Sequence, residues 1–168
     1  GDVRNNMCYA LMFGCCKLGV DFVGYGPKEL IDGVDQNVME RVRRQAEQSG
    51  ASITLTTDRQ ALHGADAVYS DIWASMGEED KIPARTQLLT PYRVDERLLA
   101  DTHNPGVIFM HCLPSFHDTG TVMAQTWLEK GVDIREVADS VFRSPRSVVF
   151  DQAENRMHAI KAILVATL

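Results

Sequence analysis

Residues 65–71 read ADAVYSD, and residues 105–114 read PGVIFMHCLP. Each stretch holds a short apolar run, typical of a buried strand, that ends abruptly in polar residues. Residues 22–24 and 53–55 are similar short runs next to turn-forming or polar residues. Together these patterns predict four strands, at residues 22–24, 53–55, 67–69 and 107–110.

The segments between the strands have helical patterns and ordinary helix boundaries. We expect helices at residues 6–18, 37–49, 58–63 and 121–130, with Gly19, Gly50 and Gly131 as stop signals. Strands that alternate with helices indicate parallel βαβ units. The sequence therefore predicts a single α/β domain over residues 1–168, a doubly wound, Rossmann-like parallel sheet flanked by helices.

The last helix has the clearest pattern. Asp151 is expected to cap it, and Glu154 follows at the capping-box spacing. One apolar stripe runs along the helix at helical spacing and comprises Ala153, Met157, Ile160, Leu164 and Leu168.

Composition narrows the class of protein. The 168 residues are 45% hydrophobic and 24% charged, which is ordinary for a soluble globular domain. A net charge of −6 argues against nucleic acid as a partner, and no apolar run approaches the roughly 20 residues that span a membrane. The start, GDVR, resembles neither a signal nor a transit peptide. The four cysteines lack the spacing of a zinc site, so we expect reduced thiols and a cytoplasmic protein.

Two side chains lie just past the ends of predicted strands. In open α/β sheets, ligands bind beyond the carboxyl ends of the strands, and Asp71 and Cys112 both lie there. The Asp71 carboxylate and the Ser75 hydroxyl, four residues later, suit an ammonium group, and Gly77 lets that loop bend. An ordinary capped turn would also explain this segment.

The segment HCLP at residues 111–114 has a similar ambiguity. Neighbouring strand residues point to opposite faces, so His111 and Cys112 are not expected to form a Cys–His catalytic pair. Pro114 holds Leu113 extended and leaves its carbonyl free for a ligand. Cys112 can equally be a buried structural thiol. His117 can be a ligand or a base, but the interpretation as an ordinary loop residue is favoured.

Three other features remain open on residue chemistry alone. Asn5 and Asn6 suit either a helix cap or the binding of a carboxylate. Arg156 lies beside the apolar stripe and can reach a crevice at the strand ends, or form a surface salt bridge instead. Residues 24–26, GYG, lack the third glycine of a dinucleotide-binding loop, so a simple βα turn is favoured.

Four segments together resemble the ornithine carbamoyltransferases. They occur in the family's order and are GDVRNNM at residues 1–7, DIWASMG at 71–77, HCLPSFHD at 111–118 and FDQAENR at 150–156. Relatives that use aspartate have proline at the place of Cys112 and lack the Ser-Met-Gly loop, so they fit poorly.

The resemblance implies a role for each matching residue. On the ornithine side, Asn6 would hold the α-carboxylate, Asp71 and Ser75 the α-ammonium, and Met76 would share their loop. On the carbamoyl side, the main chain at Cys112 and Leu113 would receive the carbamoyl NH2, with the Cys112 thiol beside the δ-amine. Arg156 would contact carbamoyl phosphate or the developing oxyanion. The implied reaction gives citrulline and phosphate without a metal or organic cofactor.

The family's carbamoyl-phosphate motifs, Ser-x-Arg-Thr-Arg and His-Pro-x-Gln, are not found in the 168 residues. We therefore expect a carbamoyl-phosphate-binding domain of the same polypeptide to be absent from this chain, and the complete enzyme to be a homotrimer. Three different functions stay open: a carbamoyltransferase for another amine such as putrescine, a dinucleotide-dependent oxidoreductase domain, and a non-catalytic amino-acid-binding module.

Overall fold

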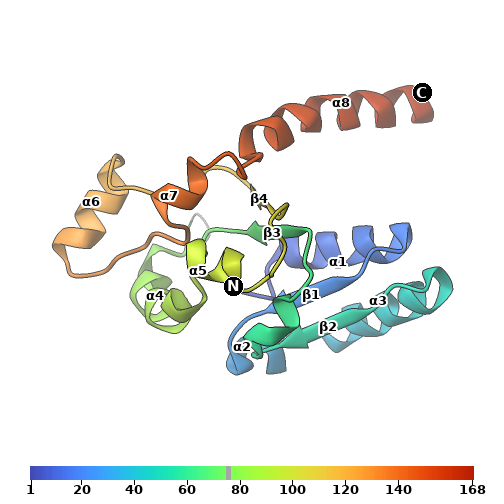
Figure 1. The fold of residues 1–168 in the computed structure, drawn as a ribbon, viewed down its shortest axis with the longest axis horizontal. Helices are drawn as coiled ribbons and strands as arrows, with labels where there is room; N and C mark the ends of the chain where they lie inside the picture. Colours follow the sequence, from blue (N-terminus) through green and yellow to red (C-terminus); the bar gives the residue numbers. More distant parts are fainter. Residues whose placement is uncertain (75–76) are drawn as a thin grey trace.

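The computed structural model describes residues 1–74 and 77–168. Within these ranges, eight helices and four strands form an α/β arrangement (Figure 1), joined by three short 3-10 turns at Arg59–Leu62, Glu79–Lys81 and Thr90–Tyr92. In chain order the helices and strands are α1 (Asn6–Leu18), β1 (Phe22–Tyr25), α2 (Lys28–Asp32), α3 (Gln36–Ser49), β2 (Ile53–Thr56), β3 (Ala67–Ser70), α4 (Ile82–Leu89), α5 (Glu96–Ala100), β4 (Ile108–His111), α6 (Val122–Glu129), α7 (Asp139–Phe142) and α8 (Val149–Thr167).

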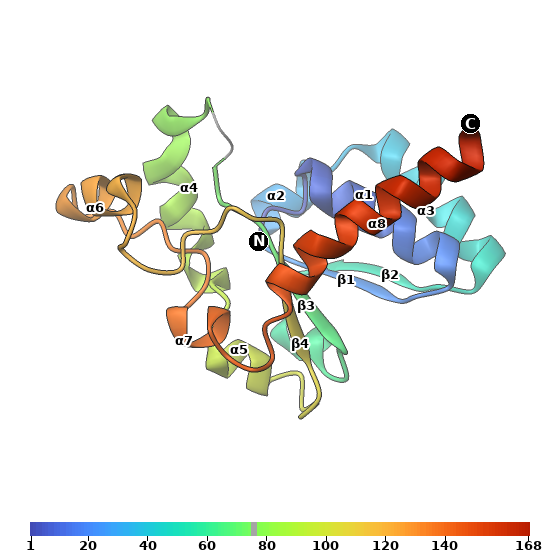
Figure 2. The ribbon, with the colours of Figure 1, turned by 90° about the horizontal axis from the view of Figure 1, so that it is seen from above.

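The strands pair in parallel, as the sequence predicts. β1 pairs with β2, with Phe22 opposite Ile53, and β3 pairs with β4, with Ala67 opposite Ile108. The α/β class and all four predicted strands are confirmed. In the described part of the chain the strands form two two-stranded sheets, which lie side by side and run in different directions (Figure 2).

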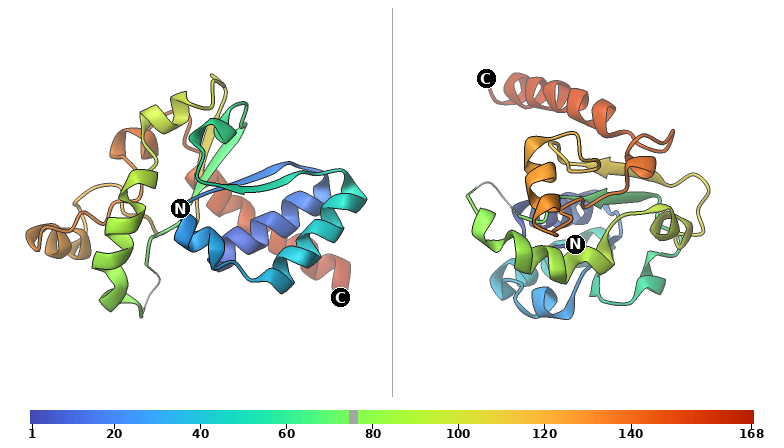
Figure 3. Two further views of the ribbon diagram at one scale, coloured as in Figure 1. Left: turned by 90° about the horizontal axis from the view of Figure 1, so that it is seen from below. Right: turned by 90° about the vertical axis from the view of Figure 1, so that its left-hand side faces the viewer.

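The first sheet carries its helices on one face. α1 and α3 lie together on the same side of β1 and β2 (Figure 3). One buried cluster joins the two helices and includes Met12 and Cys16 of α1 and Met39 and Val42 of α3. The start of α1 is fixed by Asn5, whose Oδ1 accepts a hydrogen bond from the Cys8 N–H at 2.7 Å, and its end by Gly19 at φ 69°. The predicted helix at residues 6–18 is confirmed at both ends.

The second sheet has a separate core around Phe109, which is fully buried in the middle of β4. Val137 and Val141, from the segment leading into and through α7, pack in the same cluster, as does Val149 at the start of α8. Trp73 and Leu89 belong to the first cluster instead. Trp73 follows β3 and Leu89 ends α4, so these two side chains connect the chain around the second sheet to the first core.

Helix α8 begins earlier than expected. Its N-cap is Val148, so Asp151 lies in the first turn, and the prediction that Asp151 caps the helix is wrong. The cause is tertiary: Val149 is buried in the second core, and the Val148 N–H donates to the Phe109 carbonyl at 3.0 Å. These contacts fix the helix start before the capping signal is reached.

The apolar stripe on α8 faces solvent. Figure 1 shows α8 running apart from the other helices, and Met157, Ile160 and Leu164 are 53%, 47% and 50% exposed. In the described part of the chain, the α8 side chains that are not exposed, Val149 and Gln152, both lie in its first turns. Among the described residues, no helix combines the length and the apolar character needed to cross a membrane.

Candidate active site at the ends of β3 and β4

The pairing of β3 with β4 brings two predicted site residues together. Ser70 lies opposite His111 at the ends of the two strands, so the chain leaves both strands at the same edge. The next residues are Asp71 and Cys112, and the Cys112 Sγ donates a hydrogen bond to Asp71 Oδ1 at 2.6 Å. The site therefore follows directly from parallel pairing of two short strands.

The Asp71 carboxylate has two more donors. The Ile72 N–H donates to Oδ1 at 2.8 Å, and Asn5 Nδ2 donates to Oδ2 at 2.9 Å. Asn5 thus caps α1 with its oxygen and holds Asp71 with its nitrogen, which links the first half of the chain to the site. None of the described lysine, arginine or histidine side chains forms an ion pair with Asp71. Among the described residues, the carboxylate accepts three hydrogen bonds and pairs with no cationic side chain.

The Cys112 thiol is protonated at neutral pH. Burial raises its pKa to about 12, and the hydrogen bond to Asp71 and the negative charge of that residue act in the same direction. A protonated thiol donates hydrogen bonds but is a poor nucleophile. Cys112 is therefore suited to orienting a ligand and not to forming a covalent intermediate.

Tyr69 adds a buried hydroxyl near this pair. Burial raises the pKa of its hydroxyl, and the nearby Cys112 and Asp71 contribute to the shift. Sequence reasoning missed Tyr69, because a tyrosine within a strand is ordinary.

His111 points away from Cys112, as strand alternation predicts. Its Nε2 lies 3.1 Å from Glu136 Oε1, and both side chains are 0% exposed. The backbone N–H of His111 donates to Gln152 Oε1 at 3.1 Å, and this hydrogen bond joins β4 to the first turns of α8. Glu136 was missed, since nothing in the local sequence distinguishes it from a surface residue.

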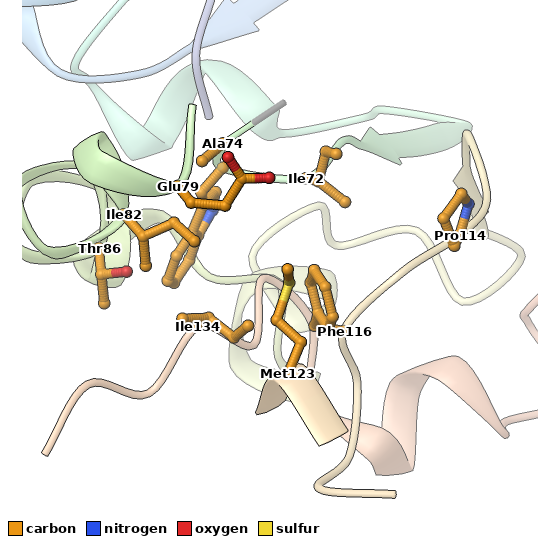
Figure 4. A pocket seen from close by; sticks show the side chains of 10 residues that line it. Ile72, Ala74, Glu79, Ile82, Thr86, Pro114, Phe116, Met123 and Ile134 are labelled. Atoms are coloured by element: carbon orange, nitrogen blue, oxygen red, sulfur yellow. The ribbon is translucent and has the colours of Figure 1, made fainter. Parts of the chain in front are cut away.

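An apolar cavity of about 90 Å³ is lined by residues of the segments that follow Asp71 and Cys112 in the chain (Figure 4). Ile72, which follows Asp71, and Pro114, which follows Leu113, both contribute to its wall. Trp73, Phe116 and Met123 line it further, and Glu79 is the acidic residue at its edge. The site thus combines a carboxylate with a neighbouring apolar surface.

Other predicted residues lie elsewhere. Asn6 and Arg156 are both exposed, and neither side chain has a hydrogen bond or ion pair within the described ranges. The surface salt bridge considered for Arg156 is therefore not formed either. Leu113 is half-buried and packs against the second core. Ser75 and Met76 fall outside the described residues.

His117 belongs to a surface network. Its Nδ1 lies 2.7 Å from Asp139 Oδ1, and its ring stacks on Phe142 with the centroids 3.8 Å apart. Asp118 lies close enough to complete a three-residue metal-ligand set. Arg143, however, donates to Asp139 at 2.8 Å and to Asp118 at 3.0 Å. Its guanidinium thus bridges the two carboxylates and offsets part of their negative charge.

Comparison with known proteins agrees with this geometry. Residues 1–167 match the family model for the aspartate/ornithine carbamoyltransferase Asp/Orn binding domain. The catabolic ornithine carbamoyltransferase of Clostridium perfringens is 49% identical over 170 residues, covering 99% of this chain and 51% of that protein.

Solved structures give the same result. The ornithine carbamoyltransferase from Pyrococcus furiosus matches with a TM-score of 0.75 and 37% identity, over 94% of this chain and 44% of that one. The anabolic ornithine carbamoyltransferase from Campylobacter jejuni matches with a TM-score of 0.80 and 29% identity, over 96% and 47%. The chain spans about half the length of the curated relatives it matches. From its motifs, its fold and these matches, the chain belongs to the aspartate/ornithine carbamoyltransferase family.

Proposed function

We propose that this chain is the amino-acid-binding part of an ornithine carbamoyltransferase, which moves the carbamoyl group of carbamoyl phosphate to the δ-amine of L-ornithine. The products are L-citrulline and phosphate. The observation that carries the proposal is the contact between Asp71 and Cys112 at the ends of two paired strands. The family match and the similarity to ornithine enzymes support it.

Asp71 is the proposed partner of the ornithine α-ammonium. A carboxylate offers about four acceptor positions, and three are occupied by Asn5, Ile72 and Cys112. One position remains for an N–H of the ligand, and no other cation competes for it in the described ranges. Ser75, Met76 and Asn6 remain proposed ornithine contacts on the strength of the resemblance.

The adjoining apolar cavity supports an amino acid with a methylene chain. Ornithine carries three methylenes between its α-carbon and its δ-amine, and the walls at Ile72 and Pro114 start beside the polar pair. The neutral δ-amine attacks the carbamoyl carbon, the bond to the phosphate oxygen breaks, and the amine loses a proton. Cys112 orients the amine, while the main chain at Cys112 and Leu113 receives the carbamoyl NH2. The enzyme's contribution is positioning and electrostatic stabilisation, without a covalent intermediate.

Carbamoyl phosphate requires more than these residues supply. Arg156 is the proposed contact for it, but one arginine on an exposed helix does not make a phosphate site. We therefore propose that a carbamoyl-phosphate-binding domain of the same polypeptide completes the site. We further propose that the complete enzyme is a cytoplasmic homotrimer, for which the family resemblance is the support; four free cysteines suit that compartment.

The test is a chimera in which this chain replaces the matching half of the Clostridium perfringens enzyme, with which it shares 49% identity. We expect citrulline formation from ornithine and carbamoyl phosphate, and little product from putrescine. The unmodified relative is the positive control. A folded chimera that prefers putrescine would identify putrescine as the substrate instead of ornithine.

Direct binding distinguishes a carbamoyltransferase from an oxidoreductase domain and from a non-catalytic module. Titration calorimetry of the 168-residue chain with ornithine and with NAD tests binding without turnover. We expect weak binding of ornithine and no binding of NAD. Binding of NAD instead would move the chain to the oxidoreductases, and tight ornithine binding with an inactive chimera would favour a non-catalytic module.

A further inference from the structure

The turn that carries Cys112 and Leu113 is held at both ends by one carboxylate. Glu136 Oε1 accepts the Phe116 N–H at 2.6 Å, and the same oxygen lies 3.1 Å from His111 Nε2. His111 immediately precedes Cys112, and Phe116 follows the turn. One side-chain atom therefore spans the whole segment that forms the proposed carbamoyl side of the site.

Glu136 is itself held on a firm support. Its carbonyl accepts the Val94 N–H at 3.0 Å, and Val94 and Val137 form a parallel bridge. Both residues are buried in the second core. The carboxylate is thus fixed relative to the core and not to a surface loop.

This arrangement is costly for the fold. Burial raises the pKa of Glu136, against the opposing effect of His111 and of the Phe116 N–H. Its Oε2 and both ring nitrogens of His111 are buried without a hydrogen-bond partner among the described residues, so the approach of His111 Nε2 to Oε1 at 3.1 Å is a close polar contact without hydrogen-bond geometry. Buried polar and charged groups often contribute less to stability than apolar side chains of the same size. Stability alone therefore does not explain a glutamate here, whereas the geometry of the turn does.

We propose that Glu136 is a positioning residue for carbamoyl transfer, because its carboxylate holds His111 and Phe116 and so fixes the Cys112 thiol and the Leu113 carbonyl next to Asp71. The catalytic part of this proposal rests on the proposed function. The structural part, the fixed position of the turn, is testable on the chain without any turnover.

The test uses alkylation of the four cysteines by iodoacetamide, followed by peptide mass spectrometry. Cys112 is the reporter, and Cys8 is a matched internal control because burial raises its pKa to about 12 as well. Buried Cys16 reports global unfolding. In Glu136→Leu we expect Cys112 to react about tenfold faster, equivalent to about 1.4 kcal/mol of easier local opening, with Cys8 and Cys16 unchanged.

Three variants keep the test decisive. Glu136→Gln retains the acceptor oxygen for Phe116, so its Cys112 should react at close to the wild-type rate. The double variant His111→Leu/Glu136→Leu removes both buried polar groups and should fold even where the single variant does not. Asp133→Asn removes ion pairs three residues away and should leave Cys112 unchanged.

A folded Glu136→Leu or double variant with wild-type Cys112 reactivity overturns the proposal, as does a Glu136→Gln chain that reacts as fast as Glu136→Leu. In the wild-type chain, the Phe116 amide must also resist hydrogen exchange; exchange at the rate of a free amide would mean that the carboxylate does not hold it. In the chimera, Glu136→Leu should lower kcat more than it raises the ornithine KM, with Glu136→Gln restoring kcat. An inactive chimera with the expected alkylation pattern would refute the proposed function and leave the positioning role of Glu136 in the turn intact.

Discussion

The substitution Asp71→Asn tests the centre of the site with the smallest change in shape. It keeps the size of the side chain but removes the negative charge and turns one acceptor oxygen into a donor. In the wild-type chain both oxygens accept: Oδ1 from Cys112 and Ile72, and Oδ2 from Asn5. An asparagine can satisfy only one of these two sides, because its amide nitrogen must face a donor on the other.

Two effects of different size follow. The mismatched donor costs about 0.5–1.5 kcal/mol of stability, the usual net value of one hydrogen bond. Loss of the charged partner of a desolvated ammonium costs about 2–5 kcal/mol of binding. At about 1.4 kcal/mol for each factor of ten, ornithine binding should weaken roughly 30-fold to several thousandfold. Carbamoyl phosphate binding should change little, because the phosphate is an anion and gains nothing from Asp71.

Steady-state kinetics of the chimera, with each substrate varied in turn, measure the KM for ornithine and the KM for carbamoyl phosphate. Asp58→Asn is the matched control: Asp58 also follows a strand, but it caps a short turn by accepting the Gln60 N–H at 2.9 Å, which asparagine does equally well. An Asp71→Asn chimera with unchanged ornithine KM and unchanged kcat would remove Asp71 from the site and refute the reasoning.

Three further predictions test separate points. Cys112→Ser should leave measurable activity with reduced ornithine affinity, because the thiol orients the amine; trapping a carbamoyl thioester on Cys112 during turnover would contradict this. The 168-residue chain should fold but form no citrulline by itself, because one arginine cannot position the phosphate; substantial turnover in a citrulline assay of the purified chain would show that the carbamoyl phosphate site has been misplaced. Hydrogen bonds from Arg135 and Arg93 hold the pKa of Asp133 well below its usual range, so its contribution to stability is present above about pH 4 and is lost as the pH falls further. The urea midpoints of unfolding of Asp133→Asn and wild type should therefore differ at pH 7 and converge at low pH. A difference between the two midpoints that does not change with pH would contradict the stabilising role of the ionised Asp133.

Sequence reasoning succeeded where local signals decide structure. Asn5 and Gly19 mark the ends of α1, and the apolar runs before Asp71 and Cys112 mark β3 and β4. Those runs placed Asp71 and Cys112 past strand ends, at the edge where ligands bind. Their direct contact depends on the pairing of β3 with β4, which the runs do not specify. The short helices α2, α4, α5 and α7 were not predicted, because four to eight residues are too few for a helical period to show.

Sequence reasoning failed where distant contacts decide. Burial of Val149 sets the start of α8, so the capping signal at Asp151 had no effect. The pairing of Asn5 with Asp71 depends on how the two halves of the chain meet. Glu136 meets His111 and Phe116 only because the bridge between Val94 and Val137 places it there. None of these contacts has a signature in a window of neighbouring residues.

The separation of the strands into two sheets has a consequence for how the chain opens. With no backbone ladder between β1–β2 and β3–β4 in the described part of the chain, the two halves are joined by side chains such as Trp73, Leu89 and the Asn5–Asp71 pair. Loosening one half against the other thus breaks no ladder hydrogen bonds, and each half is expected to behave as its own cooperative unit in native-state hydrogen exchange. A ligand bound at Asp71 stabilises the contact between the two halves. With ligand, the amides of both halves should therefore exchange hydrogen through one common opening reaction, with similar free energies.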